Sequence, residues 1–158
     1  MTDQWKVETE IKTSSIINAG TGRFFCKNYP KGTIVRVQKL SNPDHIIKYN
    51  KLNELNTDTE TLIHFAHSKP HFHKHKYHKN SIFINVPFMN TNHSNHPNIK
   101  FIFTKNNKYT ILTKNVAVGD EMLQDYSSFS KINWFEDYLT SINKQSCRQL
   151  GITLKHPN

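Results

Sequence analysis

Glycine is scarce in this sequence, and its placement restricts the fold more than any other feature. Only five glycines occur among 158 residues. Glycine costs conformational entropy, so we expect each one where a side chain or a negative φ is unacceptable. Four of them stand beside β-strand patterns, in "AGTGRFF" (Gly20, Gly22), "NYPKGTIV" (Gly32) and "NVAVGDEMLQDY" (Gly119). The sequence therefore predicts tight turns and close backbone approaches at these points.

Alternating apolar and polar residues predict short β-strands toward both ends of the chain. "WKVETEI", "GRFFCK" and "GTIVRVQKL" predict a small antiparallel sheet within the first forty residues. The pattern returns in "SIFINVPFM", "IKFIFT", "YTILTK" and "EMLQDY", with a hairpin turn at "NNK". The expected class is mainly β with minor α.

A helical pattern replaces the strand pattern near the C-terminus. Ile132, Phe135, Leu139 and Ile142 recur at helical spacing, which predicts an amphipathic helix. Ser130 is placed to cap its first turn, and Gly151 suits its end or that of a following turn.

The middle of the chain, residues 41–80, has few β-branched residues, and a helix is expected near residues 58–67. Six histidines fall between His64 and His78, a density that suits a transition metal. However, lysines alternate with them, and no Cys or Asp accompanies them as in a structural zinc site. We expect a solvated loop here and predict no metal site.

The composition is that of a globular protein with 35 % hydrophobic and 11 % aromatic residues, and 158 residues suit one domain. No signal peptide or membrane-spanning run is recognised, and two cysteines are too few for a disulfide framework, so we expect an intracellular protein, nuclear or cytoplasmic. Cys26 and Cys147 are expected to be buried or half-buried. The formal charge of +9 would suit nucleic acid, but the lysines are spread along the chain, which makes nucleic acid a secondary partner.

Four blocks in a fixed order resemble the SET-domain protein lysine methyltransferases over residues 8–127. They are the Gly-x-Gly of "GTGRFF", the turn in "NYPKGTIV", "NHSNHPN" at residues 92–98, and "VAVGDEMLQDY". A variable insert at about 41–80 and a flanking helical segment at 128–158 complete a single predicted domain over 1–158. The short chain is similar to minimal viral SET domains, and it has no cysteine-rich zinc segment after the core.

This resemblance implies a SET-domain (β-clip) fold of several small sheets, in which the Asn-His-Ser segment and the closing Asp-Tyr segment cross in a pseudoknot. It implies S-adenosylmethionine as cofactor and S-adenosylhomocysteine as product. Asn92 and His93 would contact the adenine end. Ser94, Pro97 and Asn98 would shape the crossing. The methionine and ribose would be wrapped by Gly20, Thr21, Gly22, Arg23 and Phe24.

By the same resemblance, Tyr126 is the catalytic residue, whose hydroxyl orients the acceptor amine. Gln124 stands where the family usually has an aromatic residue that helps to set the number of methyl groups added. Tyr109 is a candidate for the wall of the substrate channel, and the alternative is an ordinary cross-strand aromatic. Trp134, with Tyr138, would cover the adenine or simply pack in the core.

The implied function is transfer of methyl groups to a lysine of a histone tail or another protein, laid along a strand edge near residues 41–90. The alternative is a weak or inactive SET-like module that binds chromatin or nucleic acid through its basic surface. Methylation of a small molecule is a third option, and a homodimer stays open.

Overall fold

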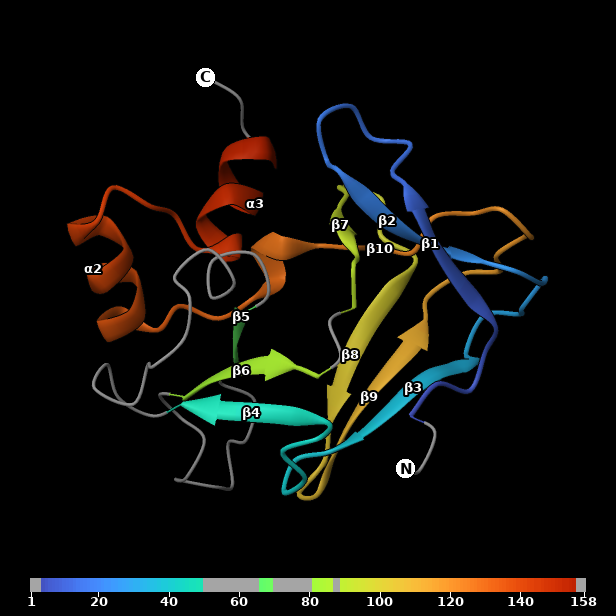
Figure 1. Ribbon diagram of the computed structural model, residues 1–158, viewed down its shortest axis with the longest axis horizontal. Coiled ribbons are helices and arrows are strands. Elements are labelled where there is room, and N and C mark those ends of the chain that lie inside the picture. The colour runs from blue at the N-terminus through green and yellow to red at the C-terminus, as the bar shows by residue number, and fades with distance from the viewer. Residues whose placement is uncertain (1–3, 50–65, 70–80, 87–88, 156–158) are drawn as a thin grey trace. The chain divides into compact units, whose positions relative to one another are not determined.

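The computed structural model describes residues 4–49, 66–69, 81–86 and 89–155 (Figure 1). The chain divides into two compact units, each built from two segments that are distant in the sequence: Met1–Leu40 with Met89–Asp125, and Ser41–Phe88 with Tyr126–Asn158. The first unit contains most of the predicted SET core, and the second contains the predicted insert and the C-terminal segment. The single domain over 1–158 stays a prediction.

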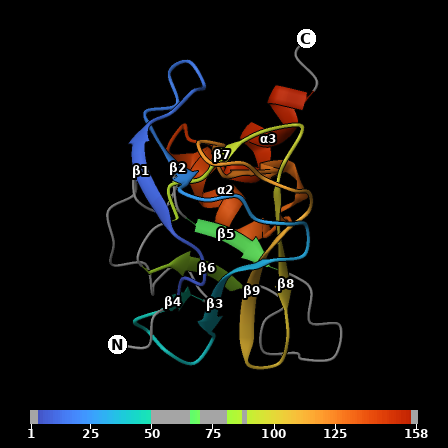
Figure 2. The same ribbon diagram turned by 90° about the vertical axis from the view of Figure 1, so that its right-hand side faces the viewer.

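The first unit consists of three small sheets. Two strands pair antiparallel, three form an antiparallel sheet in the order β3-β9-β8, and two short strands pair in parallel. Figure 2 shows β3, β9 and β8 side by side. The strands are β1 (Thr9–Thr13), β2 (Thr21–Phe25), β3 (Ile34–Lys39), β7 (Asn92–His93), β8 (Ile99–Phe103), β9 (Asn107–Leu112) and β10 (Leu123–Gln124).

The antiparallel sheet predicted for the first forty residues forms in part: β1 pairs with β2, and Trp5 forms an antiparallel bridge with Arg36 of β3, but β3 itself joins neither β1 nor β2. It pairs with β9, about seventy residues later, through a register that includes Val37 opposite Tyr109. The reason is the core: Val35 on β3 and Leu112 on β9 belong to one buried cluster with Phe25 and Met122. Burial of this shared apolar surface favours the long-range pairing over the local one.

The described residues of the second unit form an antiparallel sheet in the order β4-β6-β5 and the helices α2 and α3. Its core packs Ile82 and Ile84 of the sheet against Ile132, Phe135 and Leu139. The elements are β4 (Ile46–Tyr49), β5 (Ala66–Lys69), β6 (Ser81–Asn85), the short 3₁₀ helix η3 (Tyr126–Ser128), α2 (Asn133–Ser141) and α3 (Cys147–Lys155). The predicted class, mainly β with several small sheets and minor α, is confirmed.

The helices of this unit correct two predictions. Ser130 does not cap α2, because Ile132 holds the N-cap position and no side chain bonds the helix start. Gly151 does not end a helix but lies buried inside α3, a second helix that the sequence analysis did not separate from the first. The predicted C-terminal amphipathic pattern does form α2, and its residues Phe135 and Leu139 are buried.

Most of the predicted middle segment lies outside the described residues. The helix expected near 58–67 lies there, apart from Ala66 and His67, which belong to β5. The other histidines between His64 and His78 also lie outside the described residues. In the described part of the chain, no helix has the length and apolar character needed to cross a membrane. Cys147 is buried and Cys26 is half-buried, as predicted.

Gly151 allows α3 to lie directly on η3, the element that begins with Tyr126. A Cβ on Gly151 would overlap the backbone nitrogen of Ser127 and would come within 2.8 Å of the Tyr126 Cβ. Because the obstructing atoms include backbone, neither element can yield by a simple side-chain rotation. The glycine thus sets the distance between α3 and Tyr126.

We expect Gly151→Ala to lower the free energy of unfolding by about 1–3 kcal/mol, because the overlap outweighs the roughly 1 kcal/mol by which alanine favours a helix. Urea unfolding followed by circular dichroism measures the change. Thr153→Ala, at an exposed position of the same helix, is the control and should change stability by less than about 0.5 kcal/mol. Equal or higher stability of Gly151→Ala would show that α3 and η3 are not held at this distance.

Candidate functional site

The two segments predicted to cross do meet in the first unit. Strands β7 and β10 pair in parallel, and the Ser94 N–H donates to the Gln124 carbonyl at 2.9 Å. The side chain of Asn98 fixes the closing segment on both sides: its Nδ2 donates to the Glu121 carbonyl at 2.7 Å, and its Oδ1 accepts the Leu123 N–H at 2.8 Å. Asn98 is buried, so these bonds satisfy polar groups that water does not reach.

A buried carboxylate, that of Glu121, joins this crossing to the glycine-containing segment. Its oxygens accept the Ser14 hydroxyl at 2.7 Å, the Ser15 N–H at 2.9 Å, the Ser15 hydroxyl at 2.6 Å and the Asn92 amide at 2.8 Å. A Cβ on Gly22 would overlap the Glu121 Oε1. We call this cluster, Ser14, Ser15, Gly22, Asn92 and Glu121, the junction.

The junction brings together three of the blocks on which the resemblance rests. Asn92 belongs to the Asn-His-Ser block, Gly22 to the Gly-x-Gly block and Glu121 to the closing block. The Asn92 Nδ2 also lies 3.0 Å from the Thr21 carbonyl, so one amide contacts both other blocks. Sequence analysis did not identify Glu121, Ser14 or Ser15, although Glu121 stands inside a quoted block.

The environment of Glu121 holds the pKa of its carboxyl below the ordinary value. Burial by itself raises the pKa, but the hydrogen bonds from Ser15, Asn92 and Ser14 lower it and prevail. The carboxylate is therefore the form that the junction stabilises.

The other residues predicted to wrap the cofactor lie in or beside β2. Gly20 has a φ of 71°, and a Cβ there would meet no atom within 4 Å. Arg23 and Phe24 are buried. The Arg23 guanidinium forms hydrogen bonds within the first unit. Its Nε donates to the Met89 carbonyl at 2.8 Å, and its Nη1 donates to the Thr9 hydroxyl at 2.8 Å. Any ligand contact of these residues through their backbone stays a prediction.

His93 and Gln124 are register partners across the β7–β10 pair. The His93 Nδ1 lies 3.9 Å from an Asp125 carboxylate oxygen, and the Nε2 lies 3.2 Å from the Asn95 side-chain oxygen. Gln124 donates weakly to the Thr91 carbonyl at 3.4 Å. Its Oε1 is buried and accepts no hydrogen bond from the residues described, so one acceptor at the crossing is left for another donor.

Tyr109 and Trp134 have neighbours that suit their simpler interpretations. Tyr109 lies on β9 between Val37 and Ile102 as a cross-strand aromatic, and its hydroxyl accepts a bond from Asn107 at 3.3 Å. Trp134 packs with Tyr138 against the apolar core of the second unit. A role in the channel for Tyr109 and over adenine for Trp134 both stay predictions.

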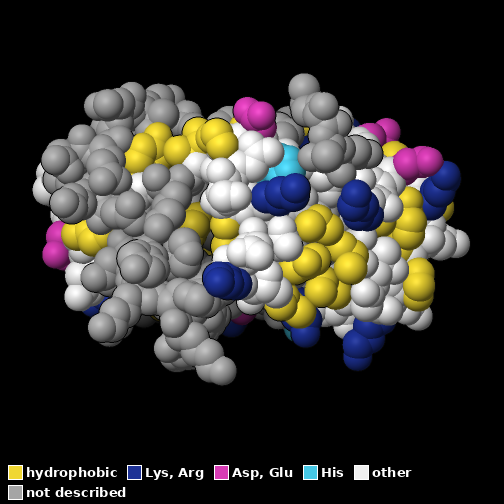
Figure 3. Space-filling model, turned by 90° about the horizontal axis from the view of Figure 1, so that it is seen from below, with side chains coloured by type: hydrophobic (Ala, Val, Ile, Leu, Met, Phe, Trp, Pro, Cys, Tyr) yellow, Lys and Arg dark blue, Asp and Glu magenta, His cyan; other side chains and the backbone are white. Residues whose placement is uncertain are grey.

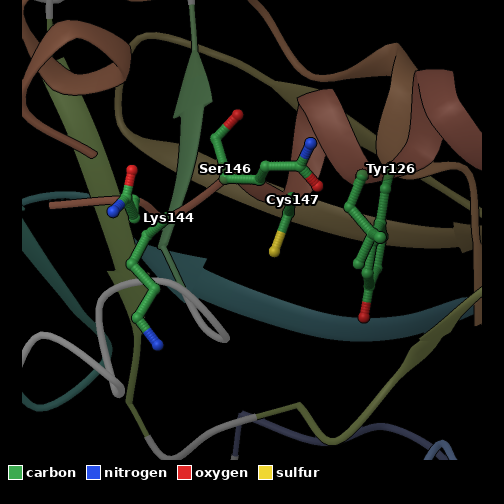
Figure 4. Close-up of a pocket in the computed structure, with 7 residues that line it drawn as sticks. Tyr126, Lys144, Ser146 and Cys147 are labelled. Atoms are coloured by element: carbon green, nitrogen blue, oxygen red, sulfur yellow. The ribbon is translucent and has the colours of Figure 1, made fainter. Parts of the chain in front are cut away.

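Tyr126 belongs to the second unit, where it lines a pocket of about 450 Å³ with residues that precede and begin α3. Figure 4 shows the side chains of Tyr126, Lys144 and Cys147 directed into the same space. The Tyr126 ring stacks on Phe129 at a centroid distance of 5.7 Å. Burial raises the pKa of the Cys147 thiol to about 12, so this cysteine stays protonated and is a poor nucleophile.

Comparison with known proteins gives a fold and no sequence relative. No family model matches the sequence, and no match was found among curated proteins. Among solved structures, a Plasmodium falciparum protein assigned as a histone methyltransferase aligns at a TM-score of 0.50 and 18 % identity, over 75 % of this chain and 91 % of its own. CpSET8 from Cryptosporidium aligns at 0.55 and 17 %, over 80 % and 60 %.

A third structure is the Chaetomium thermophilum Polycomb Repressive Complex 2 in an autoinhibited conformation bound to S-adenosylmethionine. It aligns at a TM-score of 0.58 and 14 % identity, over 87 % of this chain and 17 % of its own. This chain thus spans 60 % of the Cryptosporidium protein and about a sixth of the Chaetomium one. The chain has the SET-domain fold.

We expect Glu121→Gln to lower the free energy of unfolding at pH 7 by about 1–3 kcal/mol, because an amide N–H would then face hydrogen-bond donors. A carboxyl with a lowered pKa contributes stability above its unfolded pKa and loses it as the pH falls through the folded pKa. The difference between wild type and variant should therefore shrink below about pH 4. Urea unfolding at pH 7 and pH 3 measures it.

Glu10→Gln is the control for this comparison, because the Glu10 side chain is 55 % exposed in its pair with Lys12. Its stability should stay within about 0.5 kcal/mol of the wild type at both pH values. If the difference in free energy of unfolding between wild type and Glu121→Gln were the same at both pH values, Glu121 would not be ionised in the junction.

Proposed function

We propose that this chain is an S-adenosylmethionine-dependent protein lysine N-methyltransferase whose substrate is a histone or another lysine-bearing protein. The observation that carries the proposal is the junction, because Gly22, Asn92 and Glu121 connect three blocks of the resemblance through short hydrogen bonds and a close approach. The SET-domain fold supports it. So do the aligned structures, which include a protein assigned as a histone methyltransferase and a complex bound to S-adenosylmethionine.

The residues around the crossing fit the proposed cofactor. Asn92, His93 and the turn at Gly20 offer amide, imidazole and backbone groups, which suit the amine and hydroxyls of adenosine. The carboxylate of Glu121 and the acceptor oxygen of Gln124 suit a cation, while the Arg23 guanidinium is held by Met89 and Thr9. When bound, S-adenosylmethionine supplies a methyl group on a sulfonium, which a neutral amine displaces in line.

The chain must then orient the acceptor amine and favour its neutral form, since a free lysine has a pKa of about 10.4. We assign the orienting role to the hydroxyl of Tyr126, which lines a pocket in the second unit with Ser146 and Leu150. Apolar surroundings of the amine and the positive charge of a bound sulfonium would both favour loss of the proton. Holding the amine within attack distance is the main contribution that such an enzyme makes.

Gln124 bears on how many methyl groups are added. Its buried Oε1 lacks a donor among the described residues, so it suits an N–H of an amine that still carries a hydrogen. Neutral dimethyl-lysine, which is the acceptor in the third transfer, carries no N–H hydrogen. This favours early products, mono- or dimethyl-lysine, over trimethyl-lysine.

A catalytically weak module that binds chromatin through its basic surface is the second candidate, and the charge of +9 favours it. Homodimerisation and nucleic-acid binding are further options that accompany either function. Cofactor binding separates the two candidates, because a module without turnover has no need to hold the methyl donor.

Calorimetry with S-adenosylmethionine tests the cofactor assignment. We expect wild type to bind, and we expect Gly22→Ala to bind about tenfold or more weakly, because the added Cβ displaces the Glu121 carboxylate. Gly32→Ala is the control, since it strains a turn at φ 88° where a Cβ meets no atom within 4 Å. Folded wild-type protein that binds no cofactor would overturn the proposed function.

Transfer of tritiated methyl groups to core histones tests the assignment of Tyr126. Tyr126→Phe keeps the ring and its stacking on Phe129 but removes the hydroxyl, so cofactor affinity should stay within about threefold while transfer falls by about 10²-fold or more. Tyr138→Phe, on α2 of the same unit, is the matched control. Unchanged transfer by Tyr126→Phe would remove this hydroxyl from its assigned role.

A further inference from the structure

The sheet β3-β9-β8 carries apolar side chains on both faces. One face holds Val35, Ile99 and Leu112 in the core of the first unit. An antiparallel sheet with one covered face usually presents polar side chains on the other. Here the register places a second apolar set on the opposite face, which we call the outer sheet face: Ile34, Val37, Ile102, Tyr109 and Ile111.

These side chains are accessible to solvent. Ile34 is 41 % exposed and Ile102 is 39 % exposed, although both are large aliphatic residues. Val37, Tyr109 and Ile111 are half-buried, as expected for neighbours on an open sheet face. A contiguous apolar group of this kind on a soluble domain marks an interaction surface.

The charged residues on the three strands of this sheet and on the turns that join them are all basic. Residues 11–43 and 61–119 contain neither Asp nor Glu, and these two stretches include all three strands and their turns. Lys39 and Lys100 share the outer sheet face by register, and both are exposed. Exposed lysines at 31, 105 and 114 occupy the turns at the strand ends. In the view of Figure 3, hydrophobic side chains gather into a group with Lys and Arg side chains beside it.

The apolar and basic side chains of the outer sheet face together indicate which kind of partner fits it. A second copy of the chain would bring lysines against lysines, which costs free energy. Single-stranded nucleic acid stacks its bases on aromatic rings, whereas four of the five residues on this face are aliphatic. The outer sheet face has aliphatic side chains at its centre and lysines at its edge. It therefore suits a protein segment that carries apolar side chains and carboxylates.

We propose that the outer sheet face binds an acidic protein segment in which bulky apolar side chains lie between carboxylates. The apolar side chains pack on Ile34, Ile102 and Tyr109, and the carboxylates approach Lys39 and Lys100. Binding of this segment is separate from methyl transfer and does not depend on the proposed function.

The test uses the full chain and a fluorescein-labelled twelve-residue peptide that alternates Leu and Glu. Fluorescence anisotropy at 50 mM salt should show saturable binding. Ile102→Ser and Lys100→Glu should each weaken it by about fivefold or more, because they remove apolar contact and reverse a charge. Raising the salt to 500 mM should weaken binding as well, since it screens exposed charges.

Lys131→Glu is the matched control, because it makes the same change of charge at an exposed position of the second unit and should leave affinity within about twofold. Peptides with Gln in place of Glu, or Ser in place of Leu, should bind more weakly than the parent. Parent-peptide affinity unchanged in both Ile102→Ser and Lys100→Glu would overturn the proposal. So would a labelled twenty-nucleotide single-stranded DNA that binds while the peptide does not, or the absence of binding by either probe.

Discussion

The buried carboxylate of Glu121 is the interaction on which the first unit depends. A carboxylate only accepts hydrogen bonds, and a buried one is costly unless its oxygens are satisfied. Here Ser14, Ser15 and Asn92 supply the donors, and the missing Cβ of Gly22 supplies the space. Three segments that are far apart in the sequence are therefore held together by a single charged group. Movement of any one of them would break its contact with the Glu121 carboxylate.

The parts of the fold that sequence analysis predicted correctly are those that local patterns determine. Strand β9 follows from alternation, and α2 follows from the spacing of Phe135 and Leu139. The pairing of β3 with β9 was not predicted, because it depends on a core assembled from distant residues, including Val35 and Leu112. Pairing across about seventy residues leaves no local signal, and only the burial that it achieves explains it.

The candidate site shows the same division between local and long-range information. Gly22 and Asn92 stand out in the sequence because glycine is scarce and because the Asn-His-Ser block is unusual. Glu121 and the two serines do not, since an acidic residue in a turn and a serine pair are ordinary surface residues by composition. Their role arises only when folding removes the carboxylate from water. The same holds for Gly151, whose position inside α3 has meaning only beside Tyr126.

The junction and Tyr126 belong to different compact units. The junction contains no residue of the second unit, and the pocket that Tyr126 lines contains none of the first. Changes at Gly22 or Glu121 therefore act on a hydrogen-bonded cluster that Tyr126 does not join. Donor affinity and transfer rate should for this reason respond to different substitutions.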